Sequence, residues 1–198
     1  MPYFQKHNIE LYAEQTSKHG DPYCGDSFYY TSTNDYFICI LADGLGSGKY
    51  AYESSSVVAE IVKEHHEKDI DTLMKMCNSS LASKRGAAVA ILKVFYHSRE
   101  FVYSCVGNIR FYLYSPEGKL TYPLPVTGYL SGRPQKYKTQ RFSFQENSRF
   151  LIHSDGLNIT GVKNILQQKR TMRDILCYIQ HYVDDTADDT TYMIGSLL

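Results

Sequence analysis

Short segments rich in aromatic and β-branched residues recur along most of the chain and predict β-strands. They lie at 8–13, 27–31, 36–42, 87–96, 100–106, 109–115, 137–144, 149–154 and 190–197. Apolar residues at helical spacing predict three helices, at 50–66, 72–82 and 171–183. The order of strands, two helices, a run of strands, one helix and a last strand predicts an α+β fold with helices packed on antiparallel sheets.

One segment interrupts this regular pattern. Residues 123–134 read Pro-Leu-Pro-Val-Thr-Gly-Tyr-Leu-Ser-Gly-Arg-Pro, and the spacing of proline and glycine predicts a loop. The chain has no internal repeat, low-complexity tract or shift in composition that would place a linker. Because 198 residues suit one domain, we expect residues 1–198 to form a single unit.

Composition excludes some classes of function. The 21 basic residues balance the 21 acidic ones, which argues against binding to nucleic acid, because such binding needs a cationic excess. No apolar run reaches the length of a membrane span, and the N-terminus lacks the apolar segment of a signal peptide. The five cysteines are scattered without a metal-ligand spacing. We therefore expect a cytoplasmic monomer with reduced thiols that binds neither nucleic acid nor membrane.

Acidic residues at predicted strand ends carry the chemistry of this sequence. The segment 32–35, Ser-Thr-Asn-Asp, separates two strands and predicts a hairpin turn. A turn centred between Asn34 and Asp35 places Asp26 directly opposite Asp43. Directly paired residues have Cβ atoms only about 4.5 to 5.5 Å apart, where like charges are destabilising. Two carboxylates so close need a cation or a shared proton.

Two further acidic sites lie later in the chain. Asp155 follows the apolar strand at 149–154, and Asp188 precedes the final strand. A single Asp-Gly pair is explained by turn chemistry alone. Four acids at strand ends instead favour a set of hard oxygen ligands of the kind that Mg²⁺ or Mn²⁺ prefers.

Two other kinds of site, a nucleotide-binding loop and a histidine-ligated metal site, fit the residues less well than the acidic site does. The glycines of 44–49 resemble a nucleotide-binding loop, but Asp43 and Tyr50 stand where that motif needs glycine and serine or threonine. The adjacent His65 and His66 could suggest a histidine-ligated metal site, but neighbouring residues on a helix point in different directions. A solvated helix face explains the two histidines better. His153 shares a strand side with Asp155, so it lies either near the acidic site or in the core.

Several motifs, taken in order, resemble those of the metal-dependent serine/threonine protein phosphatases, the PPM family, in its SpoIIE-like branch. The match covers about residues 20–198 and rests on Gly25-Asp-Ser-Phe28, Ala42-Asp-Gly-Leu-Gly-Ser-Gly48, Arg85-Gly-Ala-Ala-Val-Ala90, Val106-Gly-Asn-Ile-Arg110, His153-Ser-Asp-Gly156 and Asp188-Asp-Thr-Thr191.

This resemblance implies a four-layer α-β-β-α sandwich and a phosphatase that uses two Mn²⁺ or Mg²⁺ ions to activate the attacking water. It implies that Asp43 bridges the two ions and that the Gly44 carbonyl ligates one of them. Asp155 and Asp188 would hold the other, and Asp26 would complete the shell directly or through water.

The sequence departs from the eukaryotic branch of the family at two points. Leu45 replaces a histidine that is a candidate general acid, and no arginine precedes the first metal motif. We therefore expect Arg85 or Arg110 to bind the phosphate. Asn108, in a Gly-Asn pair, is most simply a hairpin turn.

The stretch 122–137 resembles phosphatases that act on stressosome proteins in the sigma-B stress pathway. This resemblance implies phosphorylated STAS-domain partners, RsbS and RsbR, and a negative regulator of that pathway. We expect the loop to contact the protein substrate through Tyr129, Leu130, Arg133 and Lys136, because loops on rigid scaffolds often carry recognition. A catalytically silent phosphatase fold that serves as a binding module is the alternative.

The balanced charge conceals a segregation along the chain. The segment 119–141 carries five basic residues and no acid, whereas 184–189 carries four acids. The acidic cluster suits a metal site, and the basic stretch suits the acidic surface of a phosphoprotein partner.

Overall fold

The computed structural model describes residues 3–6, 8–168, 170–184 and 187–198. In chain order the elements are β1 (Tyr3–Lys6), β2 (Ile9–Thr16), the short 3-10 turn η1 (Lys18–Gly20), β3 (Asp26–Ser32), β4 (Tyr36–Gly44), α1 (Lys49–His65), α2 (Ile70–Ser80), β5 (Ala87–Phe95), β6 (Glu100–Val106), β7 (Arg110–Tyr114), β8 (Leu120–Thr121), β9 (Gln140–Ser143), β10 (Ser148–His153), α3 (Val162–Leu166), α4 (Met172–Gln180) and β11 (Thr190–Leu197).

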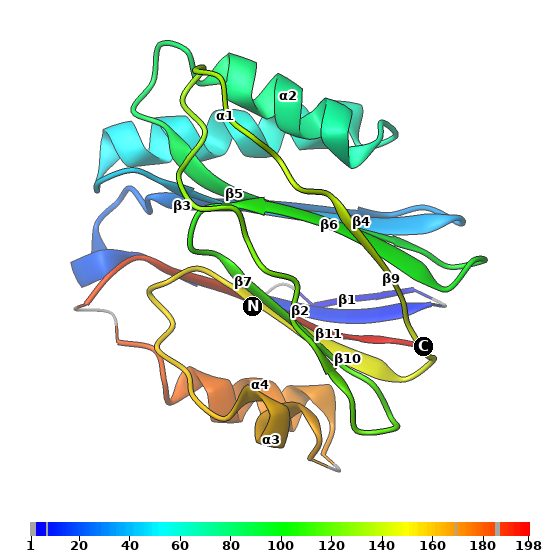
Figure 1. Ribbon diagram of the computed structural model, residues 1–198. Helices are drawn as coiled ribbons and strands as arrows, with labels where there is room; N and C mark the ends of the chain where they lie inside the picture. The colour runs from blue at the N-terminus through cyan, green and yellow to red at the C-terminus, as the bar shows by residue number, and fades with distance from the viewer. Residues whose placement is uncertain (1–2, 7, 169, 185–186) are drawn as a thin grey trace.

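Two antiparallel sheets face each other, and helices cover both outer faces (Figure 1). We call the sheet ordered β3-β4-β5-β6-β9 the upper sheet and the sheet ordered β1-β2-β11-β10-β7-β8 the lower sheet. Helices α1 and α2 lie over the upper sheet, and α3 and α4 lie under the lower one. This arrangement confirms the predicted four-layer α-β-β-α sandwich.

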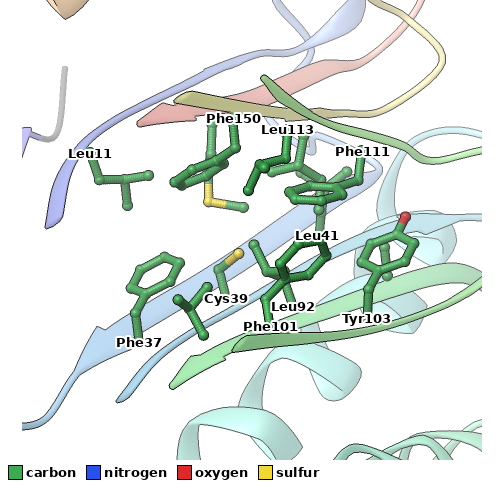
Figure 2. Close-up of a cluster of buried hydrophobic side chains, with 14 of the residues drawn as sticks. Leu11, Phe37, Cys39, Leu41, Leu92, Phe101, Tyr103, Phe111, Leu113 and Phe150 are labelled. Carbon is green, nitrogen blue, oxygen red and sulfur yellow. The ribbon is translucent and has the colours of Figure 1, made fainter. Parts of the chain in front are cut away.

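The strand β4 shows why the central strands are apolar on both faces. Phe37, Cys39 and Leu41 point into the core between the sheets, where they meet side chains of the lower sheet such as Phe150 (Figure 2). The alternate residues Ile38 and Ile40 pack against α1 and α2 instead. Since each sheet is covered on both sides, its inner strands bury both faces, and the two sheets are held in a fixed relation.

Most of the predicted elements are present, and the differences have local causes. The three predicted helices correspond to α1, α2 and α4. The short helix α3 and the strands β1 and β8 were not predicted, because five, four and two residues are too few for periodicity to stand out. The strand predicted at 137–144 shortens to β9 (Gln140–Ser143).

The five cysteines are free thiols, as expected. Within the described ranges, no helix combines the length and hydropathy required to cross a bilayer.

Candidate active site

The acidic side chains predicted from the sequence converge from both sheets at one end of the sandwich. Asp26 begins β3, and Asp43 lies near the end of β4, directly opposite it in the ladder, as predicted. Asp155 follows β10 in the lower sheet, and Asp188 precedes β11. After burial, the charges of Asp155 and Asp188 are the largest causes that raise the pKa of Asp43. The acids from the two sheets are therefore close enough to interact electrostatically. Asp185, from the acidic run at 184–189, lies outside the described residues.

Asp26 is the most unusual of these acids. Its side chain is only 1% exposed, and neither carboxylate oxygen has a hydrogen-bond partner of good geometry among the described residues. Burial first, and then the charge of Asp43, raise its pKa well above the ordinary range, although the nearby hydroxyls of Ser154 and Thr191 oppose the shift. A buried carboxylate with only such weak hydrogen bonds is costly unless a proton or a cation neutralises it.

The pKa values of Asp43 and Asp155 are raised as well, although these two acids are less buried than Asp26. Burial and the charges of Asp155 and Asp188 raise the pKa of Asp43 to about 7. Burial and the charge of Asp188 also raise the pKa of Asp155, while the Arg110 guanidinium partly opposes this. The metal-free cluster therefore retains protons toward neutral pH, and a bound cation would replace them, as expected of a cation site.

The donor set fits a hard divalent cation. Among the described residues, no group of three acidic, histidine or cysteine side chains is arranged to hold a metal ion by itself. Mg²⁺ sites commonly use only one or two carboxylates and keep several waters, so carboxylates and a backbone carbonyl are suitable donors for it. Gly44, the predicted carbonyl ligand, ends β4 where a Cβ atom would overlap the Ala51 carbonyl of α1. Only glycine permits this close approach, which brings the start of α1 against the acidic cluster.

A fifth acid, Asp189, was not among the predicted site residues. It is buried, and its carboxylate accepts hydrogen bonds from the backbone N–H groups of Gly25 at 2.8 Å and Lys18 at 2.9 Å. Because Gly25 precedes Asp26, this contact ties the start of β11 in the lower sheet to the start of β3 in the upper one. The adjacent aspartates at 188 and 189 could have indicated a second functional acid. Sequence alone does not show which of the two accepts hydrogen bonds from the backbone.

The two candidate phosphate ligands are positioned by different contacts. Arg110, at the start of β7, pairs with His153 in the ladder, and its charge reaches Asp155. The Arg85 guanidinium stacks on the ring of Tyr50 at 4.9 Å and reaches the loop after Asp43, where a Cβ atom on Gly46 would lie 2.8 Å from it. Both arginines are exposed, and of the two only the Arg110 charge is seen to act on an acid of the cluster.

The loop at 123–134 is held firmly against the upper sheet. Leu130 pairs with Ala87 through two backbone hydrogen bonds of 2.9 Å, and Val126 pairs with Val106. From α2, the Asn78 side chain accepts from the N–H groups of Ser131 and Gly132 and donates to the Arg133 carbonyl. The loop is therefore a rigid surface.

One predicted substrate contact is wrong. Leu130 is fully buried beneath the loop, in the cluster between the upper sheet and its helices, so it anchors the loop and is not available to a partner. Tyr129 is 46% exposed and lies against Gly86, on which Leu45 also packs. Arg133 of this loop and Lys136 just beyond it are exposed.

His153 belongs to the core rather than to the acidic site. It is 2% exposed, its Nδ1–H donates to the Ser154 carbonyl at 2.7 Å, and its ring stacks on Tyr112. Burial lowers the pKa of His153 to about 4, so the ring is neutral near pH 7.

Comparison with known proteins agrees with this geometry. Residues 33–194 match the family model of stage II sporulation protein E, SpoIIE. The chain is 40% identical over 193 residues to the phosphoserine phosphatase RsbX of Bacillus subtilis (strain 168), covering 98% of this chain and 97% of that protein.

Solved structures give the same relationship. A crystal structure of RsbX in complex with magnesium superposes with a TM-score of 0.96 at 39% identity, covering 100% of this chain and 99% of that one. A structure from work on the bacterial stressosome shares the fold, with a TM-score of 0.83 at 22% identity over 96% of this chain and all of the other. The chain belongs to the SpoIIE family of PPM-type phosphatases.

Proposed function

We propose that this phosphatase removes phosphate from phosphoserine or phosphothreonine on a protein, with two Mn²⁺ or Mg²⁺ ions held by the acidic cluster. The observation that carries the proposal is the buried Asp26 carboxylate, which has no hydrogen-bond partner of good geometry among the described residues and faces Asp43 in the ladder. The likeness to RsbX, a phosphoserine phosphatase whose crystal structure contains magnesium, supports it.

The carboxylates would have distinct roles toward the ions. In the proposal the Asp43 carboxylate would hold both ions together with the Gly44 carbonyl, and Asp155 and Asp188 would add ligands from the lower sheet. Asp26, opposite Asp43 in the ladder, would complete the ligand set directly or through water. When bound, the ions supply positive charge to the phosphoryl group and an activated water to attack it.

The arginines complement this arrangement at the phosphate. In the proposal Arg110 or Arg85 donates to the phosphate oxygens, since guanidinium groups suit bidentate phosphate recognition. Arg85 stacks on Tyr50 at 4.9 Å, which limits its freedom and reduces the entropy that binding would cost.

The substrates proposed are phosphorylated STAS-domain proteins of the stressosome, RsbS and RsbR, whose dephosphorylation would dampen the sigma-B response. Three features support this: the resemblance of 122–137 to phosphatases of that pathway, the 40% identity to RsbX, and the fold shared with a structure from stressosome work. A cytoplasmic location is part of the proposal.

Replacing Asp43 by Asn is expected to lower kcat on p-nitrophenyl phosphate with Mn²⁺ by roughly 100-fold or more, because a bridging ligand loses its charge. The fold should persist, since the amide nearly matches the carboxylate in shape. Asp35→Asn, in the exposed turn between β3 and β4, is the matched control and should retain full activity. A silent binding module would instead show no Mn²⁺-dependent hydrolysis in the unsubstituted protein.

The metal-free protein is expected to lose stability as the pH rises from about 4 to about 7. The raised pKa of Asp43, about 7, means that the folded state retains a proton which the unfolded carboxyl, with a pKa near ~4, has already released. Stability therefore falls with rising pH across this window. Thermal unfolding with EDTA should show the fall relative to Asp43→Asn, and saturating Mn²⁺ should remove it. Parallel pH profiles with and without Mn²⁺ would contradict the cation site.

Replacing Tyr129 by Ala is expected to reduce kcat/KM on the phosphorylated STAS protein by roughly 10-fold, as loss of an exposed aromatic contact does at interfaces. Activity on p-nitrophenyl phosphate should not change, since so small a substrate does not reach the loop. Tyr178→Ala, on α4 under the opposite sheet, is the control. An equal loss on both substrates would show that Tyr129 only supports the fold.

A further inference from the structure

The turn between β6 and β7 is the point at which the chain passes from one sheet to the other. β6 belongs to the upper sheet and β7 to the lower one, and Gly107, Asn108 and Ile109 connect them. The acidic site also draws residues from both sheets, so any contact from this turn bears on how the two halves of the site are aligned.

The turn makes such a contact through its asparagine. The Asn108 side chain donates from Nδ2 to Oδ2 of Asp155 at 2.6 Å, across 47 positions of sequence. Asn108 is exposed, so neither burial nor packing explains why its side chain adopts this position.

The chemistry of the donor matters. An ionised carboxylate only accepts hydrogen bonds, so the Asn108 amide must present its N–H group. A lysine or arginine in this place would orient Asp155 but cancel its charge. A neutral amide orients the carboxylate and leaves the full negative charge, with its remaining lone pairs, directed at a cation.

The backbone that carries Asn108 is held on both sides. Gly107 has a φ of 126°, and a Cβ atom on it would overlap Ala88 of β5. The Gly107 N–H donates to the Val126 carbonyl at 2.9 Å. On the other side, Ile109 is fully buried between the sheets. The amide is therefore presented from a rigid turn, which suits a group whose task is to fix another side chain.

We propose that Asn108 is a positioning residue that holds the Asp155 carboxylate of the lower sheet in register with Asp43 of the upper sheet for binding of the divalent cations. The inference rests on the proposed function and deepens it, since it assigns a role to a residue that does not touch the substrate. Groups that orient metal ligands typically change metal affinity or activity by about 10- to 100-fold when they are removed.

The test is Asn108→Ala, with Asn34→Ala as the matched control in the exposed turn between β3 and β4. The Mn²⁺ midpoint is measured from the rise of the melting temperature with Mn²⁺ concentration, which needs no catalysis, and kcat and KM are measured on p-nitrophenyl phosphate. We expect Asn108→Ala to raise the Mn²⁺ midpoint roughly 10-fold and to lower kcat at limiting Mn²⁺, with KM and the metal-free melting temperature close to those of the parent.

The controls separate the possible failures. Absence of Mn²⁺-dependent hydrolysis in the parent protein would refute the proposed function itself. A functional parent with an unchanged Mn²⁺ midpoint in Asn108→Ala would overturn the positioning role alone. Should alanine disturb the turn, Asn108→Ser keeps a residue that turns accept but is too short to reach Asp155, and the same shift in midpoint is expected.

Discussion

Repulsion between carboxylates that the backbone forces together is the constraint on which this site depends. Asp26 and Asp43 oppose each other because the turn before β4 sets the ladder. There the Thr33 hydroxyl accepts from the N–H groups of Asp35 and Tyr36, and the Thr33 N–H donates to the Tyr36 carbonyl. With this turn closed, the two acids cannot separate without breaking the hairpin. At such proximity the pair needs a shared proton or a cation, and the raised pKa of both carboxyls reflects that need.

The remaining structure serves to bring two further carboxylates to the same place from a different sheet. The apolar core between the sheets, with Phe37 from β4 and Phe150 from β10 among its members, fixes the distance between the layers. Polar contacts at the site then fix the alignment. Asp189 holds Gly25 beside Asp26, and Gln15 of β2 bonds both the Asp26 carbonyl and the Thr191 hydroxyl. The crowded acids of the site lower the stability of the folded protein, and the core packing and these hydrogen bonds offset that cost.

Much of the fold and part of the site could be predicted from local sequence signals. The strands follow from runs of aromatic and β-branched residues, and the opposition of Asp26 and Asp43 follows from a turn only a few residues away. The positions of Asp155 and Asp188 at strand ends marked them as candidate ligands, and the resemblance to PPM phosphatases placed them in one site with Asp26 and Asp43, which no local rule does. The burial of Leu130 was not predictable, because it results from pairing with Ala87, a partner distant in sequence, and the loop has no periodicity that marks one residue as inward-facing. The contact of Asn108 with Asp155 was missed for the same reason.

The most direct test of the cation site is a crystal of the protein soaked in Mn²⁺ and measured for the anomalous scattering of manganese. We expect two anomalous peaks in contact with the Asp43 carboxylate, with the Gly44 carbonyl near one and Asp155 and Asp188 near the other. Well-occupied manganese peaks elsewhere in the crystal, with none beside Asp43, would contradict the proposed site.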